Sequence, residues 1–461
     1  MSTNPPPSVG GPPVLGQTVR FAREPLPLVE DVVDEYGPVS RMRVLGVGEF
    51  YNLASPDSLE RALVTDRDAF AKSPGFRVAF GENVLSTAGE QWEHQREALD
   101  EFFYPARIRE YADRMVELTE RRLDRWPDDG RLSLHEEMSG TALDNFFGTL
   151  FDRPLDPNGD EHLRRAASDI NLWFKPTSFA LPRWVPTPAR RRFRRAVETV
   201  EREARRLLDE RSREVERGEA AAGDDLLSTL VALRETDGDG DREATLTDSE
   251  IVDQVVGLVF AGHDTTALAM TYALHQLGSH PGVRERFHAE LDDVLGGDRP
   301  TLSDVSDLAV TERILTETLR LYPPVHTIPR VTTRSVEMGG YELDADTRAH
   351  LSVWAVQRNE QYWDDPSEWR PARWRDTSPQ DAGYAYAPFG AGPRLCLGRR
   401  FALLEAQIVL TLVGQRFELG PERPLAFTPM STTQPAHEVP TKVRRRRDGT
   451  RRRKTRVGFG Q

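Results

Sequence analysis

The chain has 461 residues, 38% of them hydrophobic, and a formal net charge of −13. This length allows a large core. The single cysteine, Cys396, excludes a disulfide framework, a four-cysteine zinc site and a cysteine-ligated iron–sulfur cluster. No stretch resembles a secretory signal or approaches the roughly 20 apolar residues of a membrane helix. We therefore expect a cytoplasmic protein with no membrane span.

The charge is unevenly distributed along the chain. Residues 441–461 hold ten Lys or Arg and one acidic residue, so the preceding part has a net charge of −22. That acidic part argues against nucleic-acid binding, because phosphate contacts require a basic face. Only four residues of the chain are lysine. A salt-adapted cytoplasm, as in some archaea, explains an acidic and lysine-poor surface. A GC-rich genome explains the lysine shortage as well, and both explanations stay open.

The N-terminal half is predicted to be mostly helical. Residues 1–27 are rich in Pro and Gly and predict an extended leader. Weak alternation around Gly46 and Gly48 predicts a hairpin at 39–53. From about residue 59 to 230 the hydrophobic pattern is helical.

A long central helix is predicted next. Thr247-x-x-Glu250 forms a capping box, and the helix should continue to about Ser279, just before Pro281. At 1.5 Å per residue it would be on the order of 45–50 Å long and would cross the whole molecule.

The C-terminal half combines helices with short strands. Residues 283–322 are predicted to be helical, 328–355 to form strands and 399–417 to form the last helix. We expect one mainly α domain at 28–440, a helical bundle around the long central helix with a smaller β-rich lobe. A basic, disordered tail should follow at 441–461.

The strongest chemical signal is the segment Phe389-Gly-Ala-Gly-Pro-Arg-Leu-Cys-Leu-Gly398. Gly390 and Gly392 permit a tight turn with backbone N–H groups near the sulfur. Cys396 would lie at the start of the last helix, where the helix dipole favours a thiolate. A lone buried cysteine is usually a small hydrophobic residue, but the glycines and Arg394 argue against that interpretation here.

This decapeptide resembles the haem-binding loop of cytochromes P-450 and matches the pattern Phe-x-x-Gly-x-Arg-x-Cys-x-Gly at every fixed position. The resemblance extends over about residues 10–435. It implies the P-450 fold, haem b with Cys396 as the ligand of its iron, and insertion of one atom of O₂ into a small organic substrate. Arg394 would then reach a haem carboxylate. We expect a separate ferredoxin or flavodoxin to supply the electrons, because only 65 residues follow the cysteine.

The segment Ala261-Gly-His-Asp-Thr-Thr266 resembles the oxygen-activation segment of the same family. Alone, a threonine inside a helix more often bonds to the carbonyl four residues back, and an acid faces solvent. The resemblance implies instead that Asp264 and Thr265 are catalytic and deliver protons. His263 is interpreted as a packed or solvent-linked residue.

A third segment, Trp92-Glu-His-Gln-Arg96, places Trp92 and Arg96 on one helical face. Both side chains are hydrogen-bond donors and suit a carboxylate. Alone, an amphipathic surface helix is the better interpretation. The segment resembles the propionate-binding helix of the family, and Arg330 matches a further propionate-binding arginine.

A fourth pattern is structural. Glu317 and Arg320 share a helix face. By the resemblance, they join Arg373 in a buried network beneath the haem loop. Trp374 stands where phenylalanine is commoner.

The substrate is less constrained than the chemistry. By the resemblance, the pocket is lined by residues 76–84, 181–188 and 325–328 with Leu258 and Ala261. Their apolar character favours a lipid-like or terpenoid substrate, although core packing would give the same pattern. Alternatives are a peroxide-driven peroxygenase or an isomerase on the same fold, and a non-catalytic haem carrier or gas sensor. An acid–alcohol pair beside the haem argues against each of them.

Overall fold

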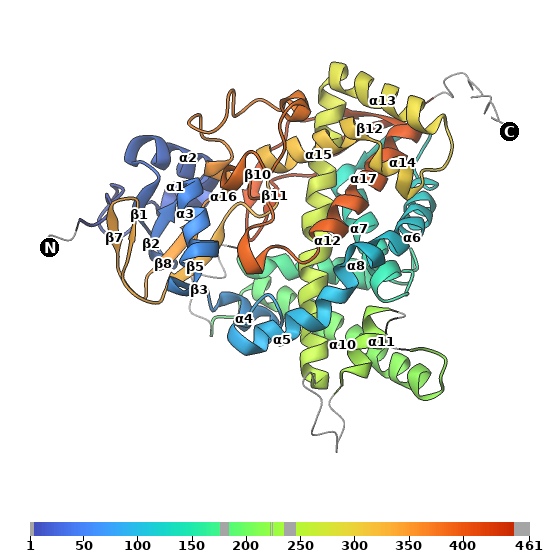
Figure 1. Ribbon diagram of the computed structural model, residues 1–461, viewed down its shortest axis with the longest axis horizontal. Coiled ribbons are helices and arrows are strands. Elements are labelled where there is room, and N and C mark those ends of the chain that lie inside the picture. The colour runs from blue at the N-terminus through green and yellow to red at the C-terminus, as the bar shows by residue number, and fades with distance from the viewer. Residues whose placement is uncertain (1–3, 176–183, 222, 224, 235–245, 447–461) are drawn as a thin grey trace, which may run out of the picture.

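The computed structural model describes residues 4–175, 184–221, 223, 225–234 and 246–446. Most of the molecule is a bundle of helices, and a smaller lobe with a twisted sheet lies at one side, near the N-terminus (Figure 1). The predicted mainly α fold class is confirmed.

One helix organises the bundle. Helix α12 (Asp248–Ser279) has 32 residues and begins at the predicted capping box. The Thr247 hydroxyl accepts from the Glu250 N–H at 3.2 Å, and the Glu250 carboxylate accepts from the Thr247 N–H at 3.0 Å. The helix runs through the centre of the bundle (Figure 1). Most of its side chains are buried, because other helices cover it on several sides.

The remaining helices pack around α12 or flank the sheet. In chain order they are α1 (Thr18–Arg23), α2 (Pro25–Tyr36), α3 (Pro56–Glu60), α4 (Gly75–Phe80), α5 (Gly89–Asp100), α6 (Pro105–Leu123), α7 (Leu134–Leu150), α8 (Glu161–Asp169), α10 (Pro188–Glu216), α11 (Leu226–Ala232), α13 (Pro281–Leu295), α14 (Leu302–Ser306), α15 (Ala309–Leu321), α16 (Val353–Val356) and α17 (Arg399–Arg416). Helices α7 and α17 both contact α12 directly.

The smaller lobe is built on a five-stranded sheet. Its order is β1-β2-β8-β5-β3, with β2 and β8 parallel and the other pairs antiparallel. These strands are β1 (Val39–Val44), β2 (Gly48–Leu53), β3 (Phe70–Lys72), β5 (Ile328–Thr332) and β8 (Arg348–Leu351). Strands β1 and β2 form the predicted hairpin. Further strands are β4 (Asp129–Ser133), β6 (Val336–Met338), β7 (Tyr341–Leu343), β9 (Phe417–Pro421), β10 (Phe427–Pro429), β11 (Thr433–Pro435) and β12 (Pro440–Arg445).

Both predicted end segments differ from the structure. The leader at 1–27 contains α1 and the start of α2. Pro25 stands in the first turn of α2. The N–H groups of a first turn have no partner within the helix, so a proline, which has no N–H, is tolerated there. The tail predicted at 441–461 begins inside β12, which pairs with both β4 and β9 and buries Val443. Composition alone could not reveal this pairing. Residues 447–461 of the predicted tail lie outside the described residues.

The single helical stretch predicted at 283–322 is three helices. α13 ends at Leu295, and Gly296 and Gly297 follow with φ of +58° and +89°. This left-handed backbone stops a helix at little cost only for glycine. α14 and α15 follow after the turn.

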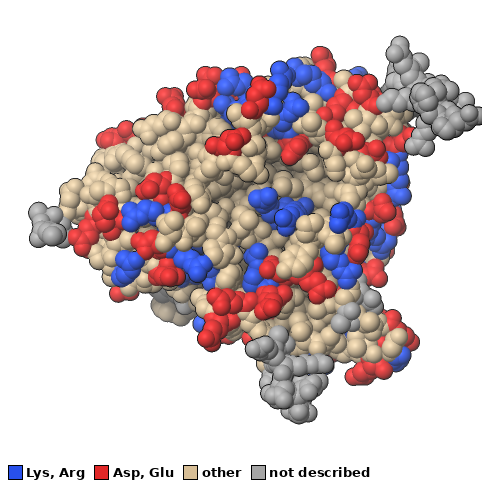
Figure 2. Space-filling view, viewed as in Figure 1, with Lys and Arg blue, Asp and Glu red and all other residues tan. Residues whose placement is uncertain are grey.

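The surface mixes both signs of charge. Figure 2 shows acidic and basic side chains interspersed over the face that it presents. Many arginines are paired; Arg416, for example, bonds to Glu120 at 2.7 Å and to Asp124 at 2.8 Å. Within the described residues, no helix combines the length and apolar character needed to cross a bilayer.

Candidate active site

The loop that carries Cys396 lies just before α17. The Cys396 N–H donates to the Phe389 carbonyl at 3.0 Å and closes the loop. Gly390 and Gly392 have φ of +72° and +67°. A Cβ on Gly392 would collide with the carbonyl of Leu63. The loop conformation therefore requires glycine at this position.

The thiol of Cys396 faces a large cavity of about 910 Å³. The side chain is enclosed by protein yet retains accessible surface, because its sulfur opens into this cavity. Burial raises the pKa of the Cys396 thiol, whereas the Gly398 N–H and the charges of Arg96 and Arg399 lower it. The loop thus presents one sulfur to the cavity, with hydrogen-bond donors and cations that favour its thiolate form.

Three basic side chains converge at one edge of the cavity. Strand register pairs Lys72 of β3 directly with Arg330 of β5, and both residues line the cavity together with Arg394. Within the described part of the chain, the side chains of all three donate to backbone carbonyls and none has a carboxylate partner. Burial, with the charges of Arg394 and Arg330, lowers the pKa of Lys72 to about 6. Burial also lowers the pKa of Arg330 and of Arg394 to about 10.

The charged form of Lys72 is disfavoured in this cluster unless an anion joins it, since like charges directly opposite each other destabilise a sheet. One nitrogen of Arg394, Nη1, is buried without a hydrogen-bond partner among the described residues. A second nitrogen, Nη2, donates to the Thr87 carbonyl at 2.9 Å. Among the described residues, the Arg330 guanidinium donates only to the carbonyl of its neighbour Pro329, at 2.9 Å. The unused donors and the uncompensated charge fit a ligand with two carboxylates, as haem has.

Trp92 and Arg96 of α5 also line the cavity, but their side chains already contact other residues of the protein. The Arg394 guanidinium lies 4.3 Å from the centre of the Trp92 ring. Arg96 donates to Asp100 at 2.7 Å and to the Leu395 carbonyl at 3.0 Å. Arg96 therefore ties α5 to the loop of Cys396, and one of its nitrogens is already committed to a carboxylate.

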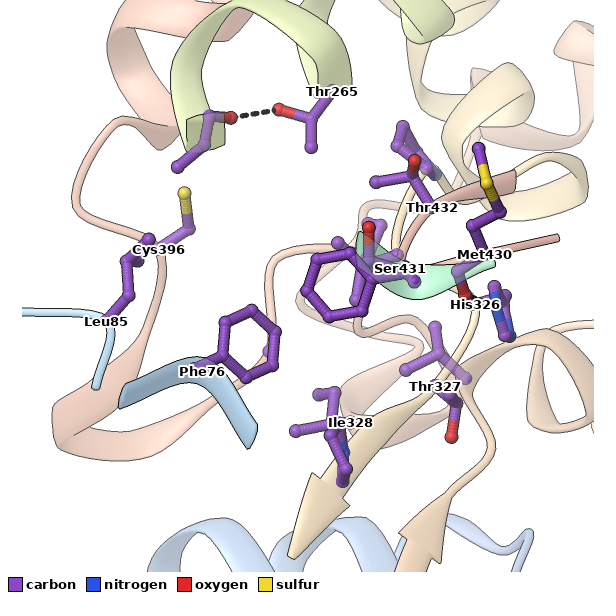
Figure 3. Close-up of a pocket in the computed structure, with 18 of the residues that line it drawn as sticks. Phe76, Leu85, Thr265, His326, Thr327, Ile328, Cys396, Met430, Ser431 and Thr432 are labelled. Carbon is purple, nitrogen blue, oxygen red and sulfur yellow. Dashed lines mark hydrogen bonds between the residues drawn. The ribbon is translucent and has the colours of Figure 1, made fainter. Parts of the chain in front are cut away.

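Helix α12 brings Thr265 to the cavity, where Figure 3 shows its side chain together with Cys396. Its hydroxyl donates to the Ala261 carbonyl at 2.7 Å, the bond to the carbonyl four residues back that is common for helix threonines. The oxygen of Thr265 stays available as an acceptor. His263 is buried on the helix, with Nδ1 3.0 Å from the Val259 carbonyl, which favours the packed interpretation.

Asp264 is buried at 5% exposure and does not face solvent. Its carboxylate accepts from the Thr432 hydroxyl at 2.9 Å. It also accepts from the Gln434 amide at 2.9 and 2.8 Å. Both partners come from the β10–β11 region, 168 and 170 residues further along the chain. This region therefore holds the acid in place beside Thr265.

Comparison with known proteins agrees with this geometry. The family model described as Cytochrome P-450 matches residues 5–440. The chain belongs to the cytochrome P-450 family. Cyclooctat-9-en-7-ol 5-monooxygenase of Streptomyces melanosporofaciens is 31% identical over 420 residues, which cover 89% of each chain. Pentalenene oxygenase of Streptomyces avermitilis is 30% identical over 433 residues, 91% of this chain and 93% of its own. The crystal structure of cytochrome P-450DA heme domain has a TM-score of 0.84 at 25% identity, covering 97% of this chain and 99% of that chain.

The chain is thus a cytochrome P-450 monooxygenase, a member of a family of haem-dependent oxidoreductases. The network predicted for this P-450 has its three members in contact. Glu317 and Arg320 are both fully buried and bond at 2.9 and 2.8 Å, and Arg373 lies 3.4 Å from Glu317. Trp374 donates its indole N–H to Glu317 at 2.8 Å, a bond that a phenylalanine could not make.

This network is connected to the loop of Cys396 through Gln357. The Gln357 amide donates to the Leu319 and Arg320 carbonyls at 2.9 and 2.8 Å. Its oxygen accepts from the Ala387 N–H at 2.9 Å, two residues before the P-450 loop begins.

Sequence patterns missed three residues of the site. Lys72 has no motif around it, and only its place in β3, opposite Arg330, shows its position in the cation cluster. Thr432 and Gln434 reach Asp264 from a distant segment, so no local pattern could reveal them. The only sequence signal for Lys72 was the rarity of lysine, since the chain has four lysines.

The cavity walls near α12 agree in part with the predicted pocket residues. Phe76, Val84, Leu258, Ala261 and residues 325–328 line the cavity. Of the predicted lid at 181–188, residues 181–183 lie outside the described residues. The part at 184–188 is not among the lining residues.

Proposed function

We propose that this P-450 holds haem b through Cys396 and hydroxylates or epoxidises a terpenoid, with electrons from a separate ferredoxin or flavodoxin. One observation carries the proposal. The Cys396 thiol and Thr265 line one cavity (Figure 3), and the edge of this cavity holds three basic side chains that have no carboxylate partner among the described residues. Haem supplies the activation of O₂ and the insertion of one of its atoms.

Different residues of the chain bind different parts of the cofactor. The Cys396 thiolate is the iron ligand, and Gly390 and Gly392 shape the loop that presents it. Lys72, Arg330 and Arg394 bind the two propionates, which supply the anions that the cluster requires.

Two further contacts orient this binding site. The Trp92 ring keeps the Arg394 guanidinium in place. Arg96 acts mainly by holding the Leu395 backbone, so that the loop stays against α5. A direct bond from Arg96 to a propionate would require it to share its guanidinium with Asp100.

Asp264 and Thr265 deliver the two protons that the reaction consumes with two electrons. The acid is held by Thr432 and Gln434, which fixes its carboxylate on the buried side of α12. A proton taken up by Asp264 passes to the Thr265 oxygen through ordered water, because neighbouring side chains of a helix do not face each other, and the Thr265 hydroxyl donates into the cavity once it leaves the Ala261 carbonyl. Because Asp264 is buried, its reprotonation requires movement of the β10–β11 region or an ordered water.

Network residues Glu317, Arg320 and Arg373 support the fold and do not take part in the chemistry. All five N–H donors of Arg320 are bonded, to Glu317 and to the carbonyls of Gln357, Pro366 and Glu368. A saturated, fully buried guanidinium has no donor left for substrate or cofactor.

The terpenoid substrate is supported by the walls of the cavity and by the relatives. Phe76, Phe174 and Phe260 form a contiguous aromatic wall, with ring centres 5.4 Å apart for the first pair and 5.7 Å for Phe174 and Phe260. Such a wall excludes water and suits a bulky hydrocarbon. The relatives cyclooctat-9-en-7-ol 5-monooxygenase and pentalenene oxygenase are named for a terpenoid alcohol and a terpene hydrocarbon.

The separate electron donor and the cytoplasmic location belong to the same proposal. The chain matches its relatives over the P-450 region, and its single cysteine is free. A free cysteine that must stay reduced suits the cytoplasm, where ferredoxins and flavodoxins are also found.

The test is turnover with a surrogate ferredoxin, its reductase and NADPH against a library of terpenes and fatty acids. We expect a product with one added oxygen atom from at least one terpene, labelled when ¹⁸O₂ is used. Label incorporation from H₂¹⁸O instead, or turnover of fatty acids alone, would contradict the proposal.

A further inference from the structure

The cavity has a polar end far from Cys396. Figure 3 shows His326, Met430 and Ser431 gathered on the side of the cavity opposite the cysteine, with Thr327 beside them. His326 and Thr327 precede β5, and Met430 and Ser431 lie between β10 and β11. A purely hydrocarbon ligand could not bond to the acceptor sites that these residues leave open.

His326 offers an acceptor to the cavity. Its Nε2 lies 3.1 Å from the Met430 carbonyl, and because a carbonyl only accepts, Nε2 must carry the hydrogen. The other nitrogen, Nδ1, has no hydrogen-bond partner among the described residues. Burial lowers the pKa of His326 to about 4, so the ring is neutral at physiological pH and Nδ1 keeps its lone pair. The ring is enclosed by protein but retains accessible surface, since it faces the cavity.

The hydroxyls of Thr327 and Ser431, beside His326, already donate their hydrogens to other groups of the protein. Thr327 donates to the Leu351 carbonyl at 3.2 Å. Ser431 donates to the Asn171 side-chain oxygen at 3.3 Å. Each hydroxyl oxygen can still accept a hydrogen bond. Together with Nδ1 of His326, this end of the cavity presents three acceptors and calls for a donor.

We propose that the substrate is a terpenoid alcohol, an apolar skeleton whose hydroxyl donates to Nδ1 of His326 while a remote carbon lies near Cys396. This inference rests on the proposed function and narrows its substrate class. A hydroxyl both satisfies the acceptors and orients the skeleton, whereas a ketone or an ether offers no hydrogen. The enzyme therefore acts after a reaction that installs a hydroxyl, such as a cyclisation ended by water or an earlier oxygenation.

The test measures dissociation constants of the haem-loaded protein from the haem absorbance shift. The probes are three skeletons, a mono-, a sesqui- and a diterpene, each as the alcohol, its methyl ether and the deoxygenated hydrocarbon; cedrol, cedryl methyl ether and cedrane are one such set. Loss of one hydrogen bond that leaves a buried acceptor unpaired weakens binding about tenfold. For the best-bound skeleton we expect the alcohol to bind about tenfold more tightly than its ether and its hydrocarbon.

Variants of His326 test whether its Nδ1 is responsible for the preference for the alcohol. His326→Leu should abolish it. His326→Gln keeps an N–H for the Met430 carbonyl but moves the acceptor, and should also abolish it. His326→Asn places an oxygen near the position of Nδ1 and should retain it. His275→Leu is the matched control, because His275 bonds to the Arg423 carbonyl in the same way at 2.8 Å but is not among the lining residues of the cavity.

The outcomes separate the two proposals. Equal affinity for alcohol, ether and hydrocarbon overturns this inference and leaves the terpenoid monooxygenase intact. A preference that survives in His326→Leu overturns the assignment to His326. If no terpenoid binds, the terpenoid class of the proposed function fails, and this inference fails with it.

Discussion

Glu317 is the acceptor on which the buried network depends, so its removal should be costly. Its carboxylate accepts from Arg320 at 2.9 and 2.8 Å, from Trp374 at 2.8 Å and from the Arg370 N–H at 3.0 Å. In Glu317→Ala the guanidinium of Arg320, which has no exposed surface, loses its counter-charge. Breaking such a pair costs roughly 3–5 kcal/mol. The unpaired indole and backbone N–H groups add to this. A typical domain has only about 5–15 kcal/mol of stability in all.

The assay is denaturant unfolding followed by circular dichroism, with haem content measured on the same preparations. Glu317→Ala should give haem-poor or aggregated protein, and Glu317→Gln, which keeps one acceptor oxygen, an intermediate loss. Glu110→Ala is the matched control. Glu110 pairs with Arg107 at the same spacing, at 2.7 Å, but is 61% exposed, so a few tenths of a kcal/mol is expected. Soluble, haem-replete Glu317→Ala with an unchanged unfolding midpoint would refute the structural role.

Three further substitutions test other parts of the molecule. Thr265→Ala should keep the thiolate spectrum but divert reductant to hydrogen peroxide, because positioned proton donors contribute about 10²–10⁴-fold; unchanged product per NADPH would point to another proton route. Lys72→Met should lose haem roughly tenfold faster to an acceptor such as apomyoglobin, and an unchanged rate would remove Lys72 from the propionate site. Burial raises the pKa of Glu405 to about 8 from its ordinary 4.5, so the folded state holds a proton that the unfolded state releases between these values. Stability should therefore fall as pH rises from about 4.5 to 8, by on the order of 1.4 kcal/mol per pH unit, and Glu405→Gln should flatten this slope; parallel pH profiles would show that Glu405 is ionised in the folded protein.

Sequence motifs predicted correctly those structures whose interactions lie within a few residues of one another. The capping box at Thr247 and Glu250 marks the start of α12, because the hydrogen bonds of a cap lie within four residues of sequence. The spacing of Gly390, Gly392 and Cys396 predicted a tight loop for the same reason, since the conformation of each glycine is a local property.

The contacts that the sequence could not reveal are those between distant segments. Lys72 joins Arg330 only because β3 pairs with β5 in one register, and Gln434 reaches Asp264 from 170 residues away. The predicted start of the C-terminal tail was wrong for a related reason. Composition predicted disorder from residue 441, but pairing with β4 and β9 orders residues 440–445, and Val443 is buried there.

Ligation by Cys396 is tested most directly by the absorbance of the reduced protein under carbon monoxide. The wild-type protein, loaded with one haem per chain, should show the strongly red-shifted band of thiolate ligation. Cys396→Ala should lose that band even where haem is retained. A red-shifted band that persists in Cys396→Ala, or its absence from the haem-loaded wild-type protein, would show that Cys396 is not the iron ligand.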